Sequence, residues 1–96
     1  MRPTVVVNDD RQLIRELVHR FRVDNPHVFG STAASLDHAG SDLDLLVDAL
    51  PGATLFDLGL LHEELEARLG LSVDLVTPGD LSSRVRVQVL AAAKPL

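Results

Sequence analysis

Two aspartates, Asp42 and Asp44, stand two positions apart in the otherwise apolar stretch 42–47. If this stretch is a strand, its alternation turns both carboxylates to one face and Leu43, Leu45 and Val47 to the other. Two carboxylates on one face repel each other, and an apolar strand is a costly place for an uncompensated charge. A divalent cation with oxygen ligands resolves both problems, and Mg²⁺ suits such ligands. The alternative is a solvated strand end, with only Asp44 on the strand.

A glycine-serine pair, Gly30-Ser31, precedes these acids by ten residues. A glycine between a strand and a helix allows a ligand to approach the backbone closely, and a helix N-terminus offers free N–H groups to a phosphate. Ser31 adds a hydroxyl donor. The pair alone is a common turn. Its position one strand before Asp42 and Asp44 is what predicts a phosphate-binding turn near the acids.

A third acid, Asp74, lies between Val73 and Leu75 in a short apolar run. A lone charge within a strand is costly unless it faces water at a sheet edge, which is the alternative here. If its strand lies beside that of Asp42 and Asp44, three carboxylates converge and could hold two divalent ions. One ion would bridge nucleotide phosphates, and the other would lower the pKa of an attacking hydroxyl. Asp74 would bind the second ion or accept the proton of the nucleophile.

The elements before the acids must position the glycine-serine pair. The β-branched run 4–7 predicts a short edge strand or an extended arm. Apolar residues at helical spacing predict a helix over about 10–24, which Asn25-Pro26 ends. A short strand is predicted over 27–29. After the turn, residues 32–36 begin a short helix, and a loop leads to the acids.

The acids themselves are predicted on a strand over 43–47, whose apolar density indicates burial on both faces. Thr54 and Asp57 match a capping box, which predicts the start of the next helix. Gly70 is a typical C-terminal cap for that helix. A third strand is predicted over 71–77, so that Asp74 lies at its centre.

The last element is predicted as a helix that Asp80 caps and that ends before Pro95. Residues 85–90 also alternate like a strand, but Leu90 and the alanines after it favour a helix. The resulting order is helix, strand, helix, strand, helix, strand, helix. This order predicts an α/β (α+β) fold, a small mixed sheet of three to four strands flanked by helices. We expect one domain over residues 1–96.

Composition excludes several classes of protein. The chain has 96 residues, no cysteine, 46% hydrophobic residues and a net charge of −5. The lack of cysteine excludes disulfides and thiolate metal sites and fits a cytoplasmic location. No apolar run approaches the roughly 18 residues of a membrane span, and the apolar part of the N-terminus is too short for a signal peptide. The acidic balance argues against stable nucleic-acid binding and suits a nucleotide with metal, or a basic protein partner.

The motifs together resemble those of the polymerase-β-type nucleotidyltransferase superfamily. The short length resembles the minimal bacterial branch of that superfamily, the MNT-domain proteins. The resemblance rests on three segments in this order: Gly30-Ser31, Asp42-Leu43-Asp44 and Val73-Asp74-Leu75. It extends through residues 51–58 and 76–81 and covers most of the chain from about residue 27.

The resemblance implies a role for each motif residue. Asp42 and Asp44 would be ligands of two Mg²⁺ ions, with Asp74 as the third carboxylate, and Gly30 and Ser31 would contact the triphosphate of ATP. Family members of this size are typically antitoxins encoded beside a HEPN-domain ribonuclease toxin. Some neutralise it by transferring AMP from ATP to a toxin tyrosine. The resemblance therefore implies a protein adenylyltransferase with a HEPN toxin as its partner.

One departure from the family pattern concerns catalysis. Relatives usually continue the glycine-serine turn with Ala-Arg-Gly, whereas this chain has Ala33, Ala34 and Ser35. An arginine near phosphates stabilises charge in the transition state, so its absence could weaken turnover. The alternative function is therefore a module that neutralises a toxin by binding alone. A third class, an enzyme acting on RNA or a small molecule, is disfavoured because the chain is too short for an extra substrate domain.

Overall fold

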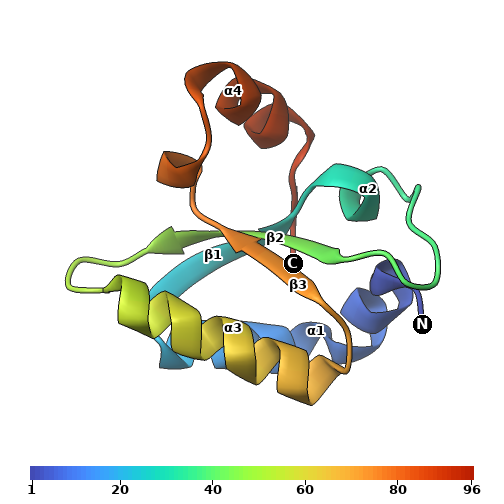
Figure 1. Cartoon of the computed structure of the whole chain (residues 1–96), viewed down its shortest axis with the longest axis horizontal. Helices are drawn as coiled ribbons and strands as arrows, with labels where there is room; N and C mark the ends of the chain where they lie inside the picture. The colour runs from blue at the N-terminus through green and yellow to red at the C-terminus, as the bar shows by residue number, and fades with distance from the viewer.

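A four-stranded mixed sheet organises the chain, and helices lie on both of its faces (Figure 1). The computed structural model describes all residues from Met1 to Leu96. Its elements are α1 (Pro3–Arg20), β1 (Val23–Val28), α2 (Gly30–Ala33), β2 (Leu43–Ala49), α3 (Leu55–Leu69), β3 (Val73–Val76), the 3-10 turn η1 (Pro78–Asp80), α4 (Ser83–Ala92) and β4 (Lys94–Pro95). The predicted mixed α/β architecture is confirmed.

The strand order is β3-β2-β1-β4. β2 and β3 run parallel, joined by the crossover helix α3, whereas β1 is antiparallel to both β2 and β4. α1 and α3 lie next to each other on one face of the sheet, and α4 lies on the other (Figure 1). No helix has the length and apolarity that a membrane span requires.

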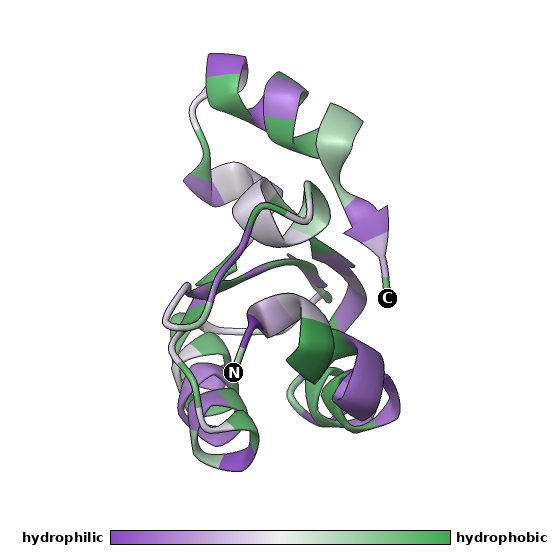
Figure 2. Ribbon diagram, turned by 90° about the vertical axis from the view of Figure 1, so that its right-hand side faces the viewer, coloured by the Kyte–Doolittle hydropathy of each residue, from purple (hydrophilic) through white to green (hydrophobic).

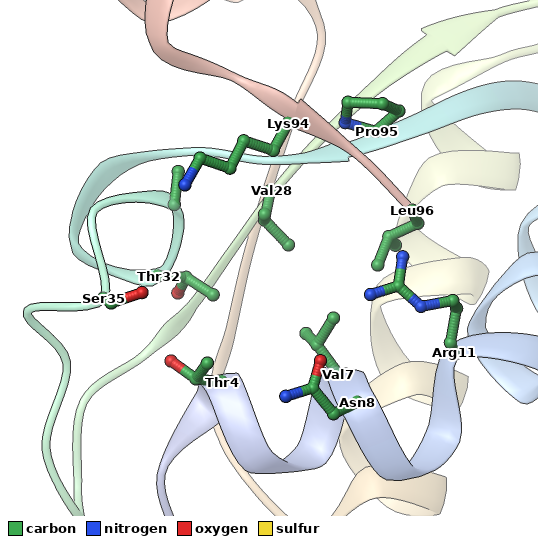
Figure 3. Close-up of a pocket in the computed structure, with 11 residues that line it drawn as sticks. Thr4, Val7, Asn8, Arg11, Val28, Thr32, Ser35, Lys94, Pro95 and Leu96 are labelled. Atoms are coloured by element: carbon green, nitrogen blue, oxygen red, sulfur yellow. The ribbon is translucent and has the colours of Figure 1, made fainter.

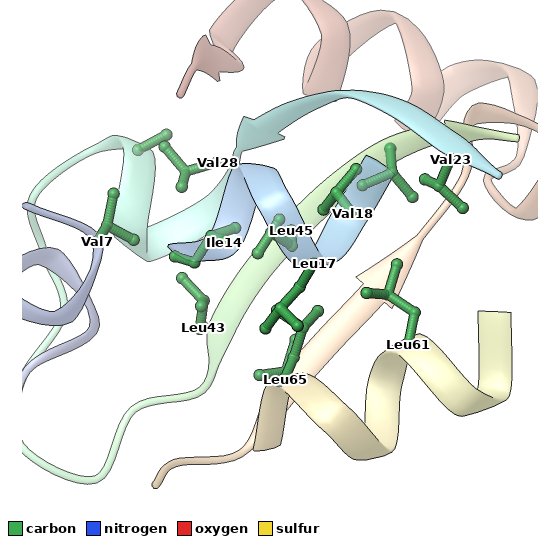
Figure 4. Packing of buried hydrophobic residues seen from close by; sticks show 13 residues of the cluster. Val7, Ile14, Leu17, Val18, Val23, Val28, Leu43, Leu45, Leu61 and Leu65 are labelled. Atoms are coloured by element: carbon green, nitrogen blue, oxygen red, sulfur yellow. The ribbon is translucent and has the colours of Figure 1, made fainter. Parts of the chain in front are cut away.

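The hydrophobic core lies between the sheet and the pair α1 and α3. On β2, Leu43, Leu45 and Val47 point into this layer, as the alternation predicts, and are almost completely buried. They pack against fully buried residues of the two helices, among them Leu17 and Leu61 (Figure 4). Each such side chain contributes roughly 1.5 to 3 kcal/mol by leaving water. The burial of this face fixes the register of β2 and turns its acids to the opposite face.

Helix α1 begins earlier than predicted. Residues 4–7 were expected as a strand or an arm, but they form the first turns of α1 behind Pro3, a residue favoured at the first helical position. The cap comes from a distant loop: a carboxylate oxygen of Asp37 accepts the backbone N–H of Thr4 at 2.8 Å. The capping chemistry expected near Asp10 appears instead as a kink, with non-helical φ −115° and ψ 22° at that residue.

The boundary between α1 and β1 is also displaced. α1 ends at Arg20 rather than near residue 24, and Asn25-Pro26 lies inside β1 instead of ending a helix. The register between β1 and β2 shifts between Asp24 and His27, and Asn25 has φ +56°. Pro26 fits this irregularity because a bulge does not require its missing N–H.

The C-terminal half follows the prediction more closely. The Thr54–Asp57 capping box is present, and Gly70 ends α3 in the left-handed conformation with φ +73°. The last element is a helix, as predicted, but Ser82 caps it. Asp80 instead pairs with Thr77 in a capping box on η1. The two-residue strand β4 completes the sheet.

Candidate active site

Asp44 lies on the sheet face opposite the core, directly beside the glycine-serine turn. Gly30 begins α2 with φ +58°, and a Cβ added to it would lie 2.6 Å from Oδ2 of Asp44. Carbon and oxygen atoms do not approach so closely without a bond, so any side chain here would displace the carboxylate. Glycine is therefore required at position 30 both for its backbone conformation and for the space that Asp44 occupies.

Backbone hydrogen bonds hold this turn against β2. The N–H of Phe29 donates to the carbonyl of Asp44 at 3.1 Å. The N–H of Asp44 faces Oγ1 of Thr32 at 3.5 Å. Thr32 is a buried polar residue of α2, and nothing in its local sequence pattern marked it. The turn and the acid-bearing strand thus form one rigid unit.

Asp74 is the neighbour of Asp44 across the parallel strands. The two residues are register partners on β2 and β3, so their side chains point to the same face. Asp74 is exposed, whereas Asp44 is partly buried. Asp42 immediately precedes β2 and is also exposed. The shared face is therefore observed for Asp44 and Asp74, whereas Asp42 lies just outside the strand, as the alternative of a solvated strand end expected.

The environment of Asp44 disfavours its charged form. Burial raises the pKa of the Asp44 carboxyl, and the negative charges of Asp74 and Asp42 raise it further. The backbone amide of Ser31 opposes this rise only in part. A cation between the carboxylates would reverse the shift, because it would replace repulsion by attraction.

The acids share a neighbourhood but do not form a closed ligand set. No three acidic or histidine side chains lie close enough together to hold a metal ion among them. Asp42, Asp44 and Asp74 are the residues that would hold such a cation. The donors are all carboxylate oxygens, the ligands that Mg²⁺ prefers, so the residues fit the predicted metal.

The turn itself presents backbone groups and a hydroxyl but no cationic side chain. Ser31 is partly buried in the first turn of α2, and Ala34 stands exposed at its C-terminal end. α2 carries no basic residue in its last turn. The structure therefore supplies no arginine at the position where the family pattern usually has one.

Asp37 is a second residue that the sequence did not mark. Its buried side chain accepts hydrogen bonds from the backbone N–H and the hydroxyl of Thr4, and Arg2 lies 3.3 Å away. These hydrogen bonds lower the pKa of Asp37 to about 2, and the two from Thr4 have the largest effect. The contact between Asp37 and Thr4 holds the loop before Asp42 against the start of α1.

A hollow of about 190 Å³ lies away from the acids, between α1, α2 and β4 (Figure 3). Arg11 and Lys94 reach over it, and Val7 and Val28 form part of its wall. None of the predicted site residues lines it. The acids instead lie on the sheet face that α4 covers. Helix α4 has no buried residue, and hydrophilic and hydrophobic segments alternate along its length (Figure 2).

Comparison with known proteins decides the family. The family described as nucleotidyltransferase domain matches residues 10–95. The chain belongs to this family. It is 42% identical to the protein adenylyltransferase MntA of Thermococcus cleftensis over 76 residues, which cover 79% of this chain and 77% of that protein. A solved structure, provisionally described as a minimal nucleotidyltransferase, has 39% identity and a TM-score of 0.87, and covers 97% of this chain and 95% of its own.

Two further solved structures are toxin–antitoxin complexes. One, a toxin–antitoxin with AMP-PNP, has 25% identity and a TM-score of 0.74 over 91% of this chain and 71% of that one. The other is a tri-AMPylated Shewanella oneidensis HEPN toxin in complex with an MNT antitoxin. It has 22% identity and a TM-score of 0.64 over 97% of this chain and 70% of that one, a likeness of fold alone.

Proposed function

We propose that this nucleotidyltransferase-family chain is an antitoxin that transfers AMP from ATP to a tyrosine hydroxyl of a HEPN toxin. The observation that carries the proposal is the register pairing of Asp44 and Asp74 beside Gly30. The carboxylate of Asp44 leaves no room for a side chain at position 30. The identity of 42% between this chain and a named protein adenylyltransferase supports the same chemistry. The similarity to a solved toxin–antitoxin complex with AMP-PNP supports a toxin as the target.

Gly30 and Ser31 would bind the triphosphate of ATP. The left-handed backbone of Gly30 opens the first turn of α2 next to Asp44. A phosphate could therefore approach the backbone N–H groups and the Ser31 hydroxyl without meeting a side chain. Asp42, Asp44 and Asp74 would hold two Mg²⁺ ions. When bound, such ions neutralise phosphate charge and lower the pKa of an attacking hydroxyl.

The exposure of the acids divides their roles. Asp44 is partly buried and fixed by the turn, so it suits a holding role. Asp74 is exposed, so a hydroxyl on another protein can reach it. In the proposed reaction the tyrosine oxygen forms a bond to the α-phosphorus of ATP. The bond from that phosphorus to the bridging oxygen breaks, pyrophosphate leaves, and the hydroxyl proton passes to the Asp74 carboxylate.

The test is transfer of AMP to the HEPN toxin that the proposal names as the partner. The purified pair is incubated with ATP and Mg²⁺, and the toxin is weighed by intact mass spectrometry. We expect toxin carrying one or more AMP groups with the wild type, and none with an Asp42→Asn, Asp44→Asn double variant. Unmodified toxin in a stable complex with the wild type would overturn the proposal.

The second candidate function is neutralisation by binding alone, and the exposed Ala34 favours it, because α2 offers no cation to the phosphates. Growth of cells that express the toxin separates the two functions. If AMP transfer protects the cells, the double variant of Asp42 and Asp44 folds and binds the toxin but fails to protect. Full protection by that variant would establish occlusion instead.

Location and domain extent follow from the same reasoning. ATP is a cytoplasmic substrate, and a chain without cysteine needs no oxidising compartment. We therefore propose a cytoplasmic location. One contiguous cluster of buried residues joins α1, the sheet and α3. Residues 1–96 are accordingly proposed to fold as a single minimal nucleotidyltransferase domain. Cooperative urea unfolding with coincident transitions by two probes would support this, and two separate transitions would contradict it.

A further inference from the structure

Helix α3 is apolar on the face turned away from the core as well as on the face turned toward it. Its inner residues Leu61 and Leu65 are fully buried. On its outer face, Leu55 is 85% exposed, Phe56 75% and Leu60 39%. The rest of the chain leaves Leu55 and Phe56 largely uncovered and Leu60 partly so. A contiguous exposed apolar surface commonly marks a contact with another protein.

The outer face contains a hollow shaped to receive a side chain. Its volume is about 240 Å³, and five residues line it, which together we call the α3 patch: Leu55, Phe56, Gly59, Leu60 and Glu63. Four of them follow the spacing i, i+3, i+4 and i+7, from position 56 to position 63. This spacing forms the hole into which a side chain of a neighbouring helix inserts.

Gly59 forms the open floor of this hole. A Cβ added there would meet no atom within 4 Å, so the fold itself has no need for glycine at this position. Glycine inside an exposed helix also destabilises the helix relative to alanine. The feature that glycine does provide is depth, because it lets a second helix approach more closely than any other residue would.

The charges around the patch indicate the chemistry of its occupant. Glu63 makes no ion pair, whereas the neighbouring Glu64 and Glu66 are paired within α3 to Arg68 and His62. An occupant with a lysine or arginine opposite Glu63 would satisfy this free charge. A second copy of the chain would bring another net charge of −5 and no basic residue on the same patch.

We propose that the α3 patch docks a basic amphipathic helix of the partner toxin, with a large apolar side chain seated over Gly59. The inference rests on the proposed function, since the partner is the protein that receives AMP. The patch belongs to α3, which lies on the core side of the sheet, with α4 on the other side (Figure 1). Asp44 and Asp74 are register partners that alternate with the buried Leu43 and Val73, so they face away from the core. Docking and chemistry therefore occupy different surfaces and can be altered separately.

The experiment measures the KM for the toxin and the dissociation constant of the complex by titration calorimetry. Gly59→Leu fills the hole, and Leu60→Asp places a charge beside it. We expect both changes to raise the KM and the dissociation constant roughly tenfold or more, because filling or charging the centre of an interface removes a hot spot. kcat at saturating toxin stays unchanged. Val5→Asp is the matched control, since Val5 is an apolar helix residue of equal exposure, 40% against 39% for Leu60.

Failure of docking and failure of function give different results. A wild type that binds toxin without transferring AMP would overturn the proposed function, and weaker binding by Gly59→Leu would still support the patch. An active enzyme whose patch variants keep the wild-type KM and dissociation constant would overturn the docking proposal. A homodimer of the isolated chain that Leu60→Asp dissociates would also overturn it, because a second copy would then occupy the patch. Circular dichroism checks that each variant is folded, and Gly59→Ala should melt higher than the wild type.

Discussion

Replacing Gly30 by alanine tests the contact on which the site is built. The left-handed φ of +58° costs a residue with a Cβ about 1 to 2 kcal/mol. The Cβ would also lie 2.6 Å from Oδ2 of Asp44, so the carboxylate or the turn must move. Such overpacking adds about 1 to 3 kcal/mol. We therefore expect Gly30→Ala to lower the free energy of unfolding by about 2 to 5 kcal/mol.

Gly70 provides the control for the backbone cost alone. It has φ +73°, and a Cβ there would meet no atom within 4 Å. Gly70→Ala should therefore cost only about 1 to 2 kcal/mol. The difference between the two variants measures the collision with Asp44. Urea unfolding at pH 7 gives both values.

A double-mutant cycle isolates the same collision. In an Asp44→Ala background the carboxylate is gone, and the remaining Cβ of residue 44 lies 3.6 Å from the added atom, an ordinary contact. Gly30→Ala should then cost about as much as Gly70→Ala, which gives a coupling energy of about 1 to 3 kcal/mol. Equal costs of Gly30→Ala in both backgrounds, together with retained AMP transfer, would refute the placement of the turn against Asp44.

Three further predictions concern charge and capping. Because folding raises the pKa of Asp44, the folded chain holds this proton more tightly than the unfolded chain, and stability falls as pH rises through the carboxylate range. Asp44→Asn should thus melt higher than the wild type at pH 7 without metal, yet lose AMP transfer; a lower melting temperature would contradict the shift. Because folding lowers the pKa of Asp37 to about 2, its contribution is complete above about pH 4 and disappears as pH falls through 2. Asp37→Asn should be less stable than the wild type in urea at pH 7, with a gap that narrows toward pH 2; a constant gap would argue against the ionic contact. Thr54→Ala removes the α3 capping box and should cost about 1 kcal/mol in the same assay, whereas no loss would mean that the cap is dispensable.

The sequence predicted those parts of the fold whose signals are local. The alternation around Leu43 and Leu45 identified β2 and the face that carries the acids, because a strand has a period of two. The ends of α3 were predicted from the capping box of Thr54 with Asp57 and from Gly70, because a capping residue lies within a few positions of the helix end that it caps.

Features that depend on distant residues were missed. The start of α1 at Pro3 could not be read locally, because its cap is Asp37, which lies 33 residues beyond Thr4. Pro26 was expected to end a helix, but the bulge that accommodates it arises from pairing with β2. The two residues of β4 carry no pattern of their own and form a strand only because β1 offers a free edge.

The candidate site shows the same division. The sequence pattern predicted a shared face for Asp42, Asp44 and Asp74, and the register of β2 and β3 places Asp44 and Asp74 there, while Asp42 stands just before β2. The distances between their side chains depend on rotamers and on a cation, which no spacing encodes. Thr32 was missed because its contact with Asp44 depends on how α2 packs on the sheet.

The most direct measurement of the central claim follows the phosphorus atom that is transferred. The wild-type chain and its proposed partner toxin are incubated with Mg²⁺ and ATP labelled at either the α- or the γ-phosphate. The account predicts that only the α-label becomes bound to the toxin, that pyrophosphate is released, and that Asp42→Asn, Asp44→Asn abolishes the labelling. Transfer of the γ-label, or an unlabelled toxin in the presence of a stable complex, would contradict it.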